Sequence, residues 1–156
     1  TVDGGNLSDV LVEDIHMTSV RLPLFIRLGN LGRGQTQSPV RPGNLQNVKI
    51  RNIRIDLSTL PIVISGIPDR DVEQIVIDDV QITAAGGSQS DLQAKVVPEL
   101  ESAYPEATMF GDLPASGLFC RHVDGIKITS LKINLARPDA REQIQMIEFK
   151  SAIFER

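Results

Sequence analysis

Residues 72–82 read VEQIVIDDVQI, and the pattern of this stretch decides the fold of the chain. Apolar side chains stand at offsets 0, +3, +5, +8 and +10 from Val72, and a short polar residue, Asp79, stands at offset +7. Three further stretches keep the same pattern: LSDVLVEDIHM at residues 7–17, LQNVKIRNIRI at 45–55 and VDGIKITSLKI at 123–133. Such self-similarity is typical of stacked units, each of which completes its core only against its neighbours.

Each of these stretches predicts two short strands that meet at a corner. The apolar residues alternate at +3 and +5 and again at +8 and +10, which is the period of a strand and not of a helix. Between the two pairs, offset +7 carries Asp14, Asn52, Asp79 and Ser130. A third strand is expected where PLFIRL begins at Pro23 and PIVISG begins at Pro61, and GLFCR at residues 117–121 resembles both.

The spacing of the repeats predicts the architecture. The two closest repeats start at residues 45 and 72, so the basic unit corresponds to residues 45–71 and carries three short strands. Units that stack strand on strand along an axis are typical of a right-handed parallel β-helix. We therefore expect an all-β chain with about four coils, folded as a single domain over residues 1–156, with two long loop insertions at residues 29–43 and 86–116.

The two insertions differ in composition. Residues 29–43 are rich in glycine and turn-forming residues and lack periodicity, which predicts a loop that leaves the end of a strand. In the longer insertion, residues 91–101 suit one or two turns of helix, and residues 104–113 are apolar enough to pack on the domain. We call residues at the same position of neighbouring units a column. Phe25, Val63 and Phe119 form an outward apolar column, which needs a cover, either this insertion or a segment outside the chain.

Composition excludes several classes of protein. A formal net charge of −4 argues against a general nucleic-acid binder, because neutralising phosphates needs a clustered basic face. No apolar run approaches the roughly 18 residues of a membrane-spanning helix. Cys120 is the single cysteine, so neither an internal disulfide nor a cysteine metal cluster is expected, and we expect it to be a small buried apolar residue. No metal or other cofactor is predicted. The chain has neither an initiator Met nor a signal peptide, and we expect Thr1 to be a cut end.

Asp78 and Asp79 form an acidic pair of the kind that glycosidases use for acid and base catalysis. The repeat offers a structural explanation for both. Asp78 belongs to an outward column in which opposite charges pair between strands, with Glu13, Arg51 and Thr129. Asp79 belongs to the corner column, where short polar side chains satisfy the backbone of a turn. His16 falls in another outward column and is expected to be solvated, whereas the role of His122 is left open. No catalytic residue is assigned.

The strongest candidates for ligand contact lie on the third strand and the loop that follows it: Arg27, Asn30, Arg33 and Arg121. Arg27 and Arg121 share an outward column with Ser65. An arginine on a rigid strand offers a planar pair of donors that suits a carboxylate, such as that of an acidic sugar. The alternative is that these arginines form salt bridges with Asp and Glu residues of the loops.

The chain resembles the C-terminal coils of glycoside hydrolase family 28, the polygalacturonase family. The likeness covers nearly the whole chain and is carried by NLSDVLVEDIHM, PLFIRLGNLGRG, PIVISGIP, ARPDAR and VPELESAYPEATMFGDLPASGLFCRHVDGIKI. The most specific parts are residues 23–34 and 97–123. The resemblance implies a right-handed parallel β-helix that hydrolyses pectic polysaccharides with inversion, and a secreted or periplasmic location.

The catalytic motifs of that family are absent from this sequence. It has no NTD and no GHG, its DD lies in a different coil, and Arg54 and Ile55 are followed by Asp56 where the family has lysine. The family places its catalytic coils earlier, so the expected function is that of C-terminal coils which are inactive in isolation and act on acidic polysaccharide within a larger hydrolase. The alternative is a free-standing, non-catalytic β-helix module that binds acidic glycan or assembles with itself.

An uncovered first coil predicts end-to-end self-association. A parallel strand edge without a partner can pair with another chain. We expect Val10, Val12, Ile15 and Met17 to lack a cover at that end. The isolated chain should then be oligomeric or poorly soluble.

Overall fold

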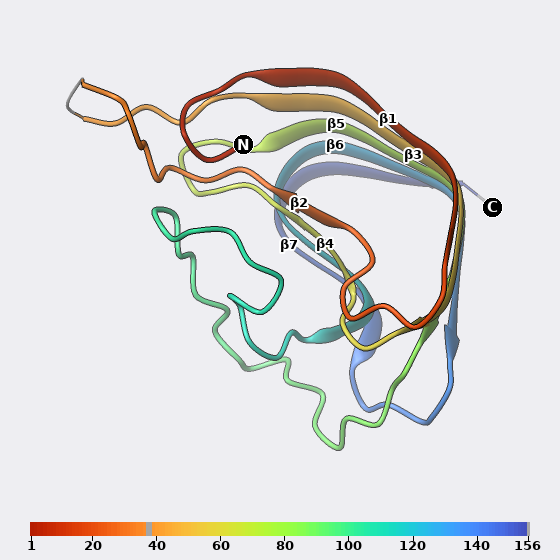
Figure 1. The fold of residues 1–156 in the computed structure, drawn as a ribbon. Helices are drawn as coiled ribbons and strands as arrows, with labels where there is room; N and C mark the ends of the chain where they lie inside the picture. The colour runs from red at the N-terminus through yellow and green to blue at the C-terminus, as the bar shows by residue number, and fades with distance from the viewer. Residues whose placement is uncertain (37–38, 156) are drawn as a thin grey trace.

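The computed structural model describes residues 1–36 and 39–155 and shows an all-β chain in which no described residue is helical (Figure 1). Gln37 and Ser38, which belong to the predicted insertion at 29–43, lie outside the described residues, as does Arg156. The strands are β1 (Leu7–Met17), β2 (Phe25–Arg27), β3 (Leu45–Ser58), β4 (Ile62–Ser65), β5 (Val72–Ala84), β6 (Ala115–Leu135) and β7 (Glu142–Glu155). No described helix is long and apolar enough to cross a membrane.

All named strands pair in parallel within one sheet of order β1-β3-β5-β6-β4-β2, and β7 pairs with β6. The long strand β6 joins the two parts of this sheet, because its first residues pair with β4 and its later residues pair with β5. The sheet therefore curls back on itself into a half-barrel around an apolar interior (Figure 1). The prediction of an all-β chain of stacked parallel strands is confirmed at this level.

The four sequence repeats lie in register. Val72 is the Cα partner of Leu45 and of Val123, and Leu45 is in turn the partner of Leu7. The same alignment holds along the strands, so Ile50, Ile77 and Ile128 form one inward column. Every apolar position of the repeat is buried in β3 and in β5. The repeat is thus the pattern of a core built from columns of aliphatic side chains.

The corners of the repeat have left-handed backbone. At offset +7, the φ angles of Asp14, Asn52, Asp79 and Ser130 are 57°, 50°, 48° and 56°. Asp and Asn adopt this conformation more readily than most residues. Sequence reasoning missed a second corner at offset +2, where Asp9, Asn47, Gln74 and Gly125 have φ angles of 58°, 52°, 56° and 79°. Each of these strands therefore bends twice, which curls the sheet.

One expectation about local structure is wrong, and one strand was not predicted. Residues 91–101 form turns and irregular backbone instead of helix. The strand β7 was not predicted, although Phe149, Ala152 and Phe154 occupy offsets 0, +3 and +5 of a fifth repeat and align with Val123, Ile126 and Ile128. The signal was weak because large aromatic residues and alanine replace the aliphatic residues of the other repeats.

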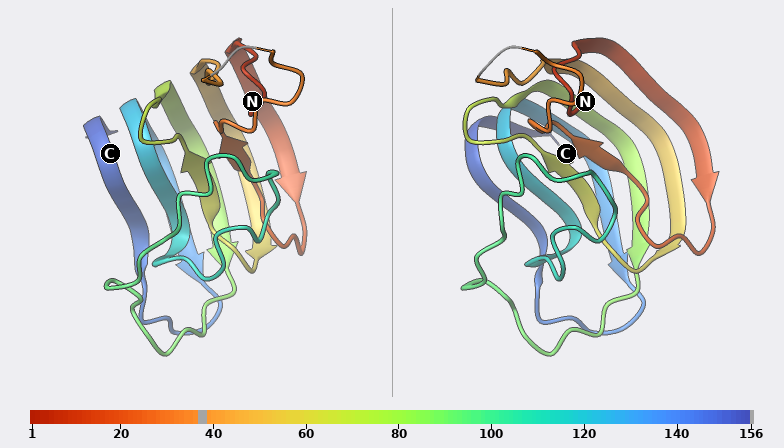
Figure 2. Two further views of the ribbon diagram at one scale, coloured as in Figure 1. Left: turned by 90° about the vertical axis from the view of Figure 1, so that its left-hand side faces the viewer. Right: turned by 60° about the vertical axis from the view of Figure 1, so that its left-hand side comes forward.

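The second insertion covers the outward apolar column, which is the first of the two alternatives that the sequence left open. Val63 and Phe119 are buried against Val97, Phe110 and Leu113 of this insertion, with Phe25 packed at the edge. The ring of Phe110 meets that of Phe25 edge to face at 6.4 Å. Figure 2 shows the insertion as a green and teal segment that crosses the outer side of the strands. Cys120 is buried on the opposite, inner side, as expected, and burial raises the pKa of its thiol.

Candidate functional site

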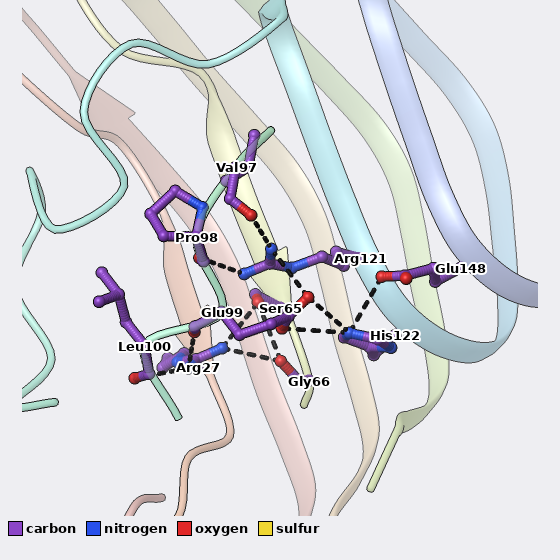
Figure 3. A network of polar contacts seen from close by, with 10 residues as sticks. All are labelled: Arg27, Ser65, Gly66, Val97, Pro98, Glu99, Leu100, Arg121, His122 and Glu148. Carbon is purple, nitrogen blue, oxygen red and sulfur yellow. Dashed lines mark hydrogen bonds and ion pairs between the residues drawn. The ribbon is translucent and has the colours of Figure 1, made fainter. Parts of the chain in front are cut away.

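The predicted ligand contacts Arg27 and Arg121 lie close together on the outer side of the sheet. Arg27 ends β2, and its Cα partner on β4 is Ser65, which in turn pairs with Arg121 on β6. The predicted column of these three residues is therefore confirmed. Both arginine side chains lie beneath residues 97–100 of the second insertion (Figure 3).

Arg27 is only 5% exposed, and its guanidinium group is engaged on both sides. It donates hydrogen bonds to the Ser65 hydroxyl (2.8 Å) and to the Gly66 carbonyl (2.7 Å). Its other terminal nitrogen donates to the carbonyl oxygens of Glu99 (2.8 Å) and Leu100 (3.2 Å). Burial, helped by the nearby positive charge of Arg121, lowers the pKa of Arg27 to about 10, so the group stays charged at neutral pH.

Arg121 is fully buried. Its guanidinium group donates to the carbonyl oxygens of Val97 (2.9 Å) and Pro98 (3.1 Å) and lies 3.2 Å from the carboxylate of Glu99. Burial lowers the pKa of Arg121, and the nearby carboxylates of Glu99 and Glu148 oppose this shift. Both arginines also face the ring of Phe110, at 5.3 Å for Arg27 and 5.1 Å for Arg121.

Through these contacts the two buried arginines attach the second insertion to the sheet. An irregular segment has no ladder to satisfy its carbonyl groups, and guanidinium donors can do so. The alternative of a salt bridge to a loop holds for Arg121 and Glu99. Whether either arginine also contacts a ligand stays a prediction, and in this structure their donors face the insertion.

Asn30 and Arg33, the other two candidates, lie apart from this pair. The backbone N–H of Asn30 donates to the Glu101 carbonyl at 2.6 Å, which ties the first insertion to the second. The Arg33 side chain is 61% exposed and forms an ion pair with Asp3 at 3.0 Å. Arg33 also donates hydrogen bonds to the Asp3 carboxylate, and these bonds raise the pKa of Arg33 and lower that of Asp3. Arg33 also lies over the ring of Tyr104 at 5.4 Å.

Arg33 and Tyr104 therefore form an exposed pair on the surface of the two insertions, since Tyr104 is itself 66% exposed. A guanidinium group beside an aromatic ring combines a donor for carboxylates with an apolar face. Of the four predicted contacts, Arg33 is the one whose charged group reaches solvent most openly. Ligand binding there stays a prediction.

His122, whose role the sequence left open, lies in a cluster with two carboxylates. The His122 side chain is 8% exposed. Its Nε2 atom lies 3.2 Å from Oε2 of Glu99 and 3.0 Å from Oε2 of Glu148 (Figure 3). Sequence reasoning missed this cluster because Glu99 belongs to an irregular insertion and Glu148 to the strand β7 that was not predicted.

The acidic pair Asp78 and Asp79 occupies the two columns that the repeat predicted. Asp78 is the strand neighbour of Arg51 and Thr129, while Arg51 forms an ion pair with Glu13 at 2.5 Å. Asp79 is the left-handed corner residue. His16 is exposed, as expected, and contacts Asp56 at 2.7 Å.

An apolar cavity of about 370 Å³ opens at the β1 end of the half-barrel. Its lining includes Val10, Val12, Ile26, Leu45 and Val48. Leu7 and Ile15 of β1 are 46% and 37% exposed, whereas their partners on β3, Leu45 and Ile53, are buried. Of the residues expected to lack a cover, Ile15 is exposed and the other three are half-buried.

Comparison with known proteins gives no relative. No protein-family model matches this chain, and neither a curated protein nor a solved structure matches it.

Proposed function

We propose that this chain forms C-terminal coils of a right-handed parallel β-helix in a polygalacturonase-like glycoside hydrolase. The observation that carries the proposal is the row-on-row register of the repeats together with the apolar end at β1. Apolar columns that run through β3, β5 and β6 reach solvent at β1, where no described residues form a covering layer. One further coil on β1 would bury them and would continue the same columns.

In this proposal the chemistry belongs to the preceding coils. An inverting glycosidase protonates the glycosidic oxygen with a carboxylic acid and activates a water molecule with a second carboxylate. The sequence of this chain contains none of the family's catalytic motifs. Its own acidic pair, Asp78 and Asp79, occupies structural positions of the repeat. The chain would then support the coils that form the substrate groove.

A direct contact with substrate would come from Arg33. Its guanidinium group is exposed, lies beside Tyr104 and suits the carboxylate of an acidic sugar. The chain carries a net charge of −4, so an acidic polysaccharide needs a local cation to bind. Asp3 already forms an ion pair with Arg33, so a substrate carboxylate would compete with Asp3 for the guanidinium group.

The test begins with the intact mass of the gene product from its source cells, compared with the 17.1 kDa of this chain. A mass well above that value, together with release of reducing ends from polygalacturonate and inversion detected by proton NMR, would support the proposal. A larger product that leaves polygalacturonate intact would overturn the assignment of substrate. A mass equal to that of this chain would overturn the hydrolase and favour the second candidate.

The second candidate is a non-catalytic module that binds acidic glycan or assembles with itself. The exposed pair of Arg33 and Tyr104 favours binding, and the open outer edges of β1 and β7 favour assembly. Sedimentation of the isolated chain tests the assembly. Association that grows with concentration is expected, and a thermostable, monodisperse monomer would contradict it.

A further inference from the structure

Glu99, His122 and Glu148 come from three separate segments and meet at one point of the surface (Figure 3). Glu99 belongs to the second insertion, His122 to β6 and Glu148 to β7. One ligand atom from each residue lies within 4.8 Å of the other two. This cluster plays no part in the function proposed above.

The backbone explains why the histidine and one carboxylate converge. The neighbours of His122 pair in register with those of Glu148, since Arg121 is the partner of Ile147 and Val123 is the partner of Phe149. Both His122 and Glu148 adopt left-handed backbone, with φ angles of 50° and 51°. Left-handed backbone is uncommon for residues other than glycine. Stacked residues with the same unusual conformation direct their side chains to the same side.

Glu99 is directed toward this point by the insertion and by the two buried arginines. Its carbonyl oxygen accepts a hydrogen bond from Arg27 at 2.8 Å. Its carboxylate oxygen Oε1 lies 3.2 Å from Arg121. Arg121 thereby orients the carboxylate through Oε1, and both carboxylate oxygens face His122, at 3.3 Å for Oε1 and 3.2 Å for Oε2.

The crowding at His122 Nε2 favours a bound cation. Three carboxylate oxygens lie around this single nitrogen, two of Glu99 at 3.3 and 3.2 Å and one of Glu148 at 3.0 Å. A ring nitrogen carries at most one proton, and one proton makes one good hydrogen bond. A cation placed between the three groups would instead satisfy the nitrogen and both carboxylates at once.

The distances of the two carboxylate oxygens from His122 Nε2 also fit a metal ion. Zinc binds imidazole nitrogen and carboxylate oxygen at about 2.0–2.1 Å, so neighbouring ligand atoms of a tetrahedral site lie about 3.3 Å apart. The nitrogen of His122 is 3.2 Å from Oε2 of Glu99 and 3.0 Å from Oε2 of Glu148. We propose that Glu99, His122 and Glu148 form a binding site for one divalent transition-metal ion, with Zn²⁺ as the preferred ion.

The surroundings leave room for the ion and for a fourth ligand. The side chains of Glu99 and Glu148 are 33% and 56% exposed, so the ion enters directly from solvent. Three protein ligands with an open fourth position are typical of zinc sites that hold water or substrate. An imidazole nitrogen in the donor set favours Zn²⁺ over Mg²⁺ and Ca²⁺, which prefer oxygen ligands.

Calorimetric titration of the metal-free chain with ZnCl₂ tests the site. We expect one equivalent of Zn²⁺ to bind with a dissociation constant in the micromolar range or below, and MgCl₂ to give no comparable binding. Glu148→Gln removes an exposed ligand without disturbing the core and should weaken binding at least about tenfold. His122→Asn, which keeps a residue suited to left-handed backbone, should abolish it.

The matched control is His16→Asn, because His16 also contacts a carboxylate but forms only an exposed pair with Asp56. Zinc binding should be unchanged in this variant. Co²⁺ added to the native chain should give the strong visible absorption of four-coordinate cobalt, and Glu148→Gln should lose it. If the native chain and Glu148→Gln bind Zn²⁺ equally, or if NMR shows His122 ion-paired and unaffected by Zn²⁺, the proposal is overturned.

Discussion

The interior of the half-barrel and the outer contact with the second insertion are held together by different means. The interior contains columns of aliphatic side chains from β1, β3, β5 and β6, which repeat from strand to strand. The outer contact joins Val63 and Phe119 to Phe110 of the insertion and contains the two buried arginines. The first region is encoded in a pattern, whereas the second is encoded in single residues far apart in the sequence.

The difference follows from where the backbone finds its hydrogen bonds. Strands of the interior satisfy one another through the parallel ladder, so their side chains can be wholly apolar. The second insertion contains no described strand before Ala115 and no described helix, and its carbonyl groups need other donors. Arginines supply them: Arg27 to Glu99 and Leu100, Arg121 to Val97 and Pro98, Arg137 to Gly86, and Arg141 to Leu113.

The interior should be the more sensitive region to loss of volume. Ile77 is fully buried and lies between Ile50 and Ile128, so Ile77→Ala leaves a cavity that regular strands cannot close. We expect the free energy of unfolding to fall by about 4 kcal/mol, measured by urea denaturation. Val76→Ala, on the half-buried outer side of the same strand, is the control and should cost about 1 kcal/mol. Equal losses would mean that the columns do not form the core.

The outer contact should depend on charge. Arg121→Met keeps much of the volume but leaves the carbonyls of Val97 and Pro98 without their donors and Glu99 without its partner. We expect a loss of about 3 kcal/mol in the free energy of unfolding. Arg54→Met, at an exposed position, should change it by less than about 0.5 kcal/mol.

A local readout separates the two regions further. Proteolysis at Lys95 should accelerate in Arg121→Met, because the insertion loses its attachment, and should accelerate less in Ile77→Ala compared at equal global stability. The same rate in both variants would show that the insertion and the interior unfold as one unit.

The attachment of the insertion should also respond to acid. Asp139 accepts hydrogen bonds from Arg141 and from the Ser88 amide, and the bond to Arg141 lowers its pKa from 3.8 to about 2. The folded state therefore gains stability from Asp139 above the ordinary pKa, and the gain is lost as pH falls from about 4 to about 2. In urea denaturation at pH 7, the free energy of unfolding of the native chain should exceed that of Asp139→Asn by roughly 1–2 kcal/mol. At pH 3 this difference should fall by roughly half. A constant difference would rule out this linkage.

The smallest expected effect concerns the corners of the strands. Asp79 has a φ of 48°, and Asp79→Val places a β-branched residue in left-handed backbone at a cost of about 1–2 kcal/mol. Its neighbour Asp78 lies on the outer side of the extended strand, and Asp78→Val should cost less than about 0.5 kcal/mol in the same thermal or urea unfolding experiment. A reversed order would show that the acidic pair has a role beyond the repeat.

The sequence predicted the interior well because its determinants are local. The stretch at residues 7–17 coincides with β1. The stretches at 45–55 and 72–82 begin with β3 and β5, and both strands continue for a few residues beyond them. Period-2 alternation and the polar corner residue act within one strand, so each repeat specifies its own strand and its own corner. The strand β7 was missed because its repeat uses Phe149, Ala152 and Phe154 in place of aliphatic residues.

The candidate sites were predicted less well because their determinants are distant in sequence. The column of Arg27, Ser65 and Arg121 was correctly aligned, yet nothing in the strand pattern shows that residues 97–100 cover it. Likewise, His122 is next to Arg121 in the sequence, but its two carboxylate partners lie far from it along the chain, one before it and one after it. Only register between β6 and β7 brings Glu148 beside it.

By itself, the sequence determined that this chain stacks parallel strands around aliphatic columns and bends them at short polar residues. A repeated pattern can specify this because every unit meets an equivalent neighbour. Only the tertiary structure determined which contacts are made by the polar residues that lie outside the pattern. It buried Arg27 and Arg121 as donors to an irregular segment, left Arg33 at the surface, and joined His122 to Glu99 and Glu148. These outcomes depend on how an insertion folds back over the strands, and no local spacing encodes that path.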